Sequence, residues 1–153
     1  MFKNKIIFLF IITFLCSCGF TPLYVNNNTE KFQIEMVEFK GDPLTNKFIN
    51  LNLKQYYKPQ GEKKYLVTMN SKYLKNSISK DKTGKTTEYK LIVNVDFKIM
   101  IDEDENERFL NFSESYYMKS MENMIDERDY ERNLIQSLTS IITQKLLTEL
   151  SKL

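Results

Sequence analysis

A long alternation of apolar and polar side chains between Tyr89 and Asp102 constrains the fold of this chain more than any other feature. Successive side chains of a β-strand point to opposite faces, so this pattern predicts an antiparallel strand with one buried and one wet face. The partner strands of this sheet, and a layer that covers its buried face, must then come from other segments of the chain. The apolar positions of the alternation are Tyr89, Leu91, Val93, Val95, Phe97, Ile99 and Ile101.

Three further segments predict strands that complete this sheet. In the first, Phe32, Ile34 and Met36 alternate with polar residues. The alternation is interrupted at Val37, where we expect a bulge or the end of the strand. The second follows Tyr65, Val67, Met69 and Tyr73, and the third runs from Phe109 to Ser120 with Leu110, Phe112, Tyr116 and Met118 in phase. A polar segment, residues 75–85, is expected to connect the second strand to the long one, and the acidic residues 102–107 to form the next turn.

Two segments predict helices. Asp42-Pro43 is a capping residue followed by proline, and apolar residues at Leu44, Phe48 and Leu51 follow before a breaker at residues 58–61. A long final helix is expected from Asp126, with an apolar stripe at Tyr130, Leu134, Leu138, Ile141, Leu146, Leu150 and Leu153. That stripe can cover the sheet or pair with a partner helix. We therefore expect an α+β two-layer sandwich: a mostly antiparallel four-stranded sheet with two helices, in the order β-α-β-β-β-α.

The N-terminus has the layout of an export signal. Lys3 and Lys5 precede an uncharged run from Ile6 to Leu15, too short to span a membrane as a helix. Leu15-Cys16-Ser17-Cys18 then fits the pattern of a bacterial lipoprotein signal, with cleavage before Cys18. The alternative is an ordinary buried element. We predict a signal peptide at 1–17, a lipidated tether at 18–30 and a domain at 31–153.

Cleavage before Cys18 changes the charge and the cysteine chemistry of the chain. The whole chain carries 22 Lys and Arg against 20 Asp and Glu, and losing Lys3 and Lys5 leaves 20 against 20. A neutral mature chain has no general electrostatic basis for binding nucleic acid. Cys16 leaves with the leader and Cys18 carries diacylglycerol and an N-acyl chain, so no disulfide is expected. The lipid on Cys18 would anchor the chain to a membrane.

The sequence offers no equipment for catalysis. The chain contains no histidine, which excludes Ser-His and Cys-His nucleophilic sites and histidine metal sites. Its four glycines are not spaced as a phosphate loop. The acidic run at 102–107 lacks the glycine and spacing of a calcium loop, so a solvated turn is the simpler interpretation. We predict a protein that is not an enzyme and has no metal or cofactor; a lipid-anchored enzyme using Asp102, Glu103 and Asp104 is the rival.

Four lysines are candidates for holding phosphate groups: Lys75, Lys80, Lys82 and Lys85. Together with Lys72 they cluster in and before the expected hairpin connection. Lysine ammonium groups bind phosphate as point charges. A solvated hairpin tip is the alternative, and the sequence leaves both open.

The residues Cys18 to Tyr24, Cys-Gly-Phe-Thr-Pro-Leu-Tyr, resemble the start of the mature LptE family of LPS-assembly lipoproteins, especially its alphaproteobacterial branch. Residues 96–101 and 109–117 are similar to the last strand pair of that family, and 127–135 to the opening of its last helix. The alanine-rich helix start typical of the family is absent at 130–133.

This resemblance implies a role without catalysis. The chain would be a lipid-anchored protein on the periplasmic side of the outer membrane, a plug and assembly partner of the LptD barrel. It would bind lipopolysaccharide and help to insert it into the outer leaflet. Gly19, in place of the aspartate that retains many lipoproteins in the inner membrane, agrees with that location. The alternative is an unrelated periplasm-facing lipoprotein that serves as a general binding or envelope-assembly module.

Overall fold

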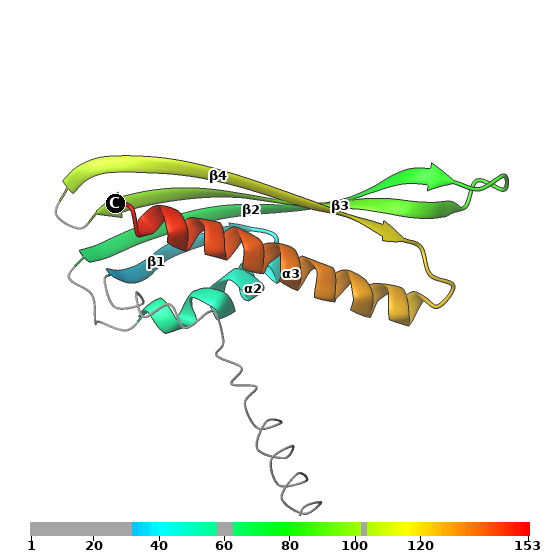
Figure 1. Cartoon of the computed structure of the whole chain (residues 1–153), viewed down its shortest axis with the longest axis horizontal. Helices are drawn as coiled ribbons and strands as arrows, with labels where there is room; N and C mark the ends of the chain where they lie inside the picture. Colours follow the sequence, from blue (N-terminus) through cyan, green and yellow to red (C-terminus); the bar gives the residue numbers. More distant parts are fainter. Residues whose placement is uncertain (1–31, 58–62, 102–103) are drawn as a thin grey trace, which may run out of the picture.

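The computed structural model of the chain describes residues 32–57, 63–101 and 104–153. Four strands form one sheet in the order β1-β2-β3-β4, and the two α-helices of the described residues lie on the same face of it (Figure 1). The predicted α+β fold with the order β-α-β-β-β-α is confirmed. Its elements are β1 (Phe32–Gly41), α2 (Pro43–Leu53), a 3-10 turn (Lys54–Tyr57), β2 (Lys63–Lys80), β3 (Thr86–Ile101), β4 (Asp104–Lys119) and α3 (Met124–Leu150).

The sheet is mixed, because β1 and β2 run parallel while β2, β3 and β4 pair antiparallel. Helix α2 connects the parallel pair, as a parallel pair requires a crossover. The irregularity expected near Val37 is present as a register shift between Met36 and Glu38.

The connection between β2 and β3 is shorter than the sequence predicted. We expected it to span 75–85, but β2 continues to Lys80 and β3 begins at Thr86, leaving 81–85 as the turn. Lys75 pairs with Leu91 and Ser77 with Tyr89 inside a regular ladder. The ladder is built from backbone hydrogen bonds, so its strands persist where side chains on both faces are polar and the alternation disappears. The same holds for the acidic segment, since β4 already begins at Asp104; residues 102–103 lie outside the described part.

The core lies between the sheet and the two helices. The predicted face of β3 is buried from Leu91 to Ile99, and Tyr65, Val67 and Met69 join it from β2. The Tyr65 hydroxyl donates to the Leu150 carbonyl at 3.1 Å, which satisfies the polar end of this buried ring. α3 is thereby fixed across the sheet close to its C-terminal end.

Helix α2 begins where the sequence predicted. The Asp42 side chain accepts a hydrogen bond from the Thr45 backbone N–H at 2.8 Å, and Pro43 occupies the first turn. Gly41 places this start: its φ is +92°, and a Cβ there would lie 1.8 Å from the Ser71 carbonyl oxygen. The predicted apolar stripe of this helix was wrong at Leu51, which is exposed. Phe48 is buried as predicted, but Ile49 and Leu53 are buried with it in place of Leu51, because the sheet meets the helix about one residue out of the expected phase.

Helix α3 begins at Met124, with Asn123 as its cap, two residues before the predicted Asp126. Its buried stripe consists of Ile135, Leu138, Ile142, Leu146 and Leu150 together with Thr139 and Thr143. The predicted positions Tyr130 and Ile141 are exposed. The sequence carries two neighbouring apolar stripes on this helix, and packing against the sheet buries only one of them.

Candidate binding surfaces

The hairpin of β2 and β3 projects beyond the rest of the sheet (Figure 1). The pairing of β1 with β2 ends at Ser71, and the pairing of β4 with β3 ends at Glu88, so the last residues of the hairpin form a two-stranded ribbon. Three of the four candidate lysines, Lys80, Lys82 and Lys85, lie exposed at its tip. The structure therefore brings these three together on one protrusion.

The turn of this hairpin is held by Asp81. Its carboxylate accepts from the Thr83 hydroxyl at 2.6 Å and from the backbone N–H groups of Thr83 and Lys85 at 2.8 and 3.0 Å. The hydrogen bond from the Thr83 hydroxyl contributes most to holding the pKa of Asp81 below its usual value. Gly84 takes a φ of +86°, which closes the turn. The lysines are thus carried on a structured tip.

The fourth candidate, Lys75, lies away from the tip and is engaged in a cluster that we call the Lys75 clasp: Lys75, Tyr73, Glu127 and Glu131. The Lys75 ammonium donates to Glu127 at 2.9 Å and to Glu131 at 2.8 Å, and it lies 4.2 Å from the centre of the Tyr89 ring. The Tyr73 hydroxyl donates to the other oxygen of Glu131. The expectation that Lys75 belongs with the hairpin lysines is therefore not supported by its position.

The clasp joins strand β2 to the first turns of α3. Glu127 also accepts from the Ser120 hydroxyl at 3.0 Å and from the Met121 N–H at 2.9 Å, in the segment between β4 and α3. The Met121 N–H and then Lys75 lower the pKa of Glu127. Burial opposes the charge of Lys75, but the hydrogen bonds to Glu131 and Glu127 outweigh it and raise its pKa. The spacing of Glu127 and Glu131, one helical turn apart, was the only sequence signal for this cluster, and it did not identify the partner lysine.

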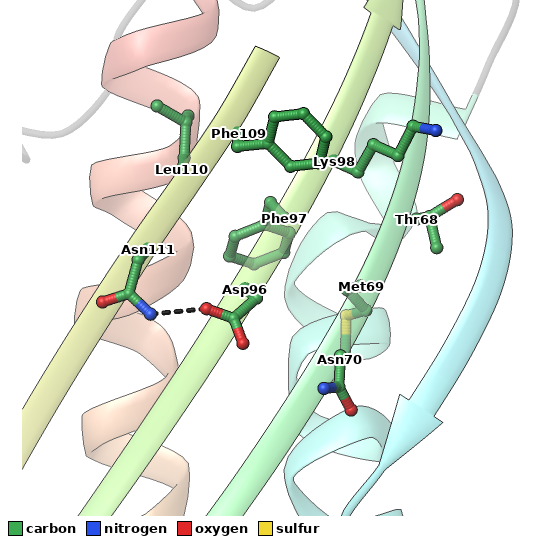
Figure 2. Close-up of a pocket in the computed structure, with 9 residues that line it drawn as sticks. All are labelled: Thr68, Met69, Asn70, Asp96, Phe97, Lys98, Phe109, Leu110 and Asn111. Atoms are coloured by element: carbon green, nitrogen blue, oxygen red, sulfur yellow. Dashed lines mark hydrogen bonds between the residues drawn. The ribbon is translucent and has the colours of Figure 1, made fainter. Parts of the chain in front are cut away.

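The face of the sheet opposite the helices carries a pocket of about 300 Å³ (Figure 2). Two rows of paired residues cross β2, β3 and β4 there: Thr68, Lys98 and Phe109 form one, and Asn70, Asp96 and Asn111 the other. The Asn111 amide donates to Asp96, and Lys98 pairs with Glu107 at 2.6 Å. Phe109 is 71 % exposed, so this pocket combines an apolar wall with polar groups, of which Asp96, Asn111 and Lys98 are already paired. We did not predict it, because no local pattern links residues so far apart in sequence.

The lipid-attachment candidate Cys18 and the proposed tether lie outside the described residues. Across the described ranges, no helix is both long and apolar enough to cross a membrane. Within those same ranges, the side chains that ligate metals do not gather in groups of three or more.

Several solved structures share this fold. The rare lipoprotein B from Shewanella oneidensis aligns with a TM-score of 0.56 and 11% identity, over 77% of this chain and 95% of its own. A candidate lipoprotein from Caulobacter crescentus aligns with a TM-score of 0.55 and 13% identity, over 78% and 88%. The uncharacterized lipoprotein B from Nitrosomonas europaea aligns with a TM-score of 0.51 and 10% identity, over 78% and 83%.

Comparison by sequence adds no relative. No protein-family model matches the chain, and no curated protein matches it significantly. The chain thus shares the fold of these lipoproteins at a sequence identity that speaks for the fold alone.

Proposed function

We propose that this chain is an outer-membrane lipoprotein of the lipopolysaccharide translocon, a plug and assembly partner of an LptD-like barrel. Two independent observations on the same chain carry the proposal together. A chain whose Cys18 to Tyr24 resemble the start of mature LptE has a domain with the fold of three structures named as lipoproteins. In this role the protein acts by binding and not by catalysis, and three acyl chains on Cys18 hold it at the periplasmic side of the membrane.

The surface of the domain suits a wet barrel interior. On the face opposite the helices, the middle of β3 presents polar and charged side chains of both signs at Asn94, Asp96 and Lys98. Two ion pairs lie on this side of the sheet, Lys64 with Glu35 at 2.9 Å and Lys98 with Glu107 at 2.6 Å. The lumen of a large outer-membrane barrel is polar, so such a surface can be enclosed without losing hydration.

A crosslinking pull-down from intact outer membranes tests the proposal. We expect a photo-crosslinking residue at Phe109, on the open sheet face, to capture a barrel protein. We expect the same at Leu51, on α2, because an enclosing barrel contacts both layers. Recovery of no LptD-like protein from either position overturns the proposal. Capture from one position only would contradict the plug arrangement and favour docking on one side.

The hairpin tip is the proposed contact for the phosphate groups of lipopolysaccharide. Reversing the charge of Lys80, Lys82 and Lys85 to glutamate should weaken binding of purified lipopolysaccharide about tenfold or more at low salt. Each exposed charge contact is worth roughly 0.2–1 kcal/mol, and salt should narrow the difference. The matched control reverses Lys47, Lys54 and Lys72, which are exposed away from the tip and change the net charge equally. Equal loss in both triple variants would assign the effect to net charge.

A further inference from the structure

The two edges of the sheet differ in how they are protected. Natural proteins protect edge strands with charges, prolines and bulges, because an unpaired edge invites another strand. Edge strand β1 has such protection: its register shifts after Met36, and Glu35, Glu38 and Lys40 are charged. Edge strand β4 has little protection of this kind. It pairs with β3 without interruption from Lys119 to Glu107, and Glu114 carries the only charge between Phe109 and Met118.

An apolar flank of α3 lies beside this edge. Tyr130, Leu134 and Ile141 share one side of the helix, adjacent to the buried stripe. Lys145, next to them on the same side, pairs with Glu114 of β4, so the flank faces the β4 edge. Tyr116 of β4 lies near Tyr130 and raises the pKa of its hydroxyl. Ile141 remains 41% exposed and Tyr130 37% exposed, although neither contributes to the core of the monomer.

The β4 edge is also self-complementary about Ser113. Phe109 and Tyr117 each lie four residues from it, and Glu107 and Lys119 each lie six. In an antiparallel pair of β4 strands centred on Ser113, Phe109 of one copy therefore lies opposite Tyr117 of the other, and Glu107 opposite Lys119. Aromatic and opposite-charge pairs of this kind stabilise cross-strand contacts. Phe109 and Tyr117 are 71% and 58% exposed in the monomer.

We propose that two copies of this chain associate through the β4 edge, with Ser113 on the twofold axis and the Tyr130, Leu134 and Ile141 flanks of α3 packed against each other. The two sheets then form one continuous sheet, and both pairs of helices lie on the same side. Each copy uses the same surface, as a twofold dimer requires. This state belongs to the protein outside any barrel complex, so it does not rest on the function proposed above.

A single introduced cysteine tests the register. The full chain with Cys16→Ser and Cys18→Ser, purified in mild detergent, leaves the new residue as the only thiol. Ser113→Cys places two cysteines directly opposite each other, about 4.5–5.5 Å apart at Cα and within disulfide reach. Oxidation should link most of this variant into a covalent dimer. Ser115→Cys is the matched control, since its two copies would be offset by roughly 13 Å along the strands.

A second pair of variants tests the helix flank in the Ser113→Cys background. Ile141→Glu should abolish the crosslink, because it brings two carboxylates together in the contact. Leu51→Glu, on the exposed side of α2, should leave the crosslink unchanged, and circular dichroism checks that both variants fold. Equal crosslinking of Ser113→Cys and Ser115→Cys, no crosslinking, or persistence in Ile141→Glu overturns the proposal.

Discussion

Cys18→Ser should leave the chain without acyl chains and with its leader still attached. The diacylglyceryl group is transferred to the cysteine thiol as a thioether, and the N-acyl chain is added to the amino group that cleavage frees. A serine hydroxyl does not replace the thiol nucleophile in the lipoprotein pattern, so neither step follows. Each buried methylene of an acyl chain contributes about 0.8 kcal/mol, and one chain alone anchors only marginally. The variant therefore loses its lasting anchor. Intact-mass spectrometry of the membrane fraction measures the outcome directly.

Cys16→Ser is the matched control for this experiment. The residue lies two positions before Cys18 and is expected to be discarded with the leader. It should be cut and acylated like the unmodified chain. Fractionation alone is not sufficient, because the retained apolar leader can itself associate with membranes. A processed, acylated mass for Cys18→Ser would contradict the predicted attachment site.

Lys75→Met should destabilise the domain by about 1–3 kcal/mol, because it removes the cation between two partly buried carboxylates. The Glu127 and Glu131 side chains are 15% and 18% exposed, so water replaces the lost contacts only in part. Urea unfolding at pH 7 measures the change. Lys82→Met at the exposed hairpin tip is the control and should leave the midpoint unchanged. An equal midpoint shift in the two variants would show that the clasp does not stabilise the fold.

The clasp also predicts a dependence on pH. The pKa of Glu127 in the folded chain lies below its usual value of 4.5, so its contribution to stability is complete above that value. It disappears as the pH falls through the lower folded value. The stability difference between the unmodified chain and Glu127→Gln should therefore be constant from pH 7 to about 5 and shrink at lower pH. A difference that grows on acidification would contradict the assignment.

Predictions from local sequence patterns were reliable where a pattern is compatible with only one type of secondary structure. The positions of β3 and of the start of α2 were predicted correctly from the alternation and from Asp42-Pro43. Side-chain alternation and helix capping both depend on only a few neighbouring residues. The strand connections were less predictable. Backbone pairing carries β2 and β3 through polar residues, and nothing local shows where such a ladder ends.

The candidate site was predictable only in part, as the lysines illustrate. Lys80, Lys82 and Lys85 are close in sequence around a turn, and the fold keeps them together. Lys75 is close to them in sequence too, yet it meets Glu127 and Glu131 more than fifty residues away along the chain. Only the docking of α3 on the sheet gives Lys75 that role.

The sequence by itself determined the α+β composition, the order of elements and the buried face of β3, because these depend on short-range periodicity. Tertiary packing decided the rest. Tertiary packing sets β1 parallel to β2 and places Lys75 against α3, away from the lysines of the hairpin tip. It also determines which of the two apolar stripes on α3 is buried in the core. Both stripes carry large apolar side chains, and the position of the sheet decides which of them is buried. The stripe left outside lies beside the unprotected β4 edge.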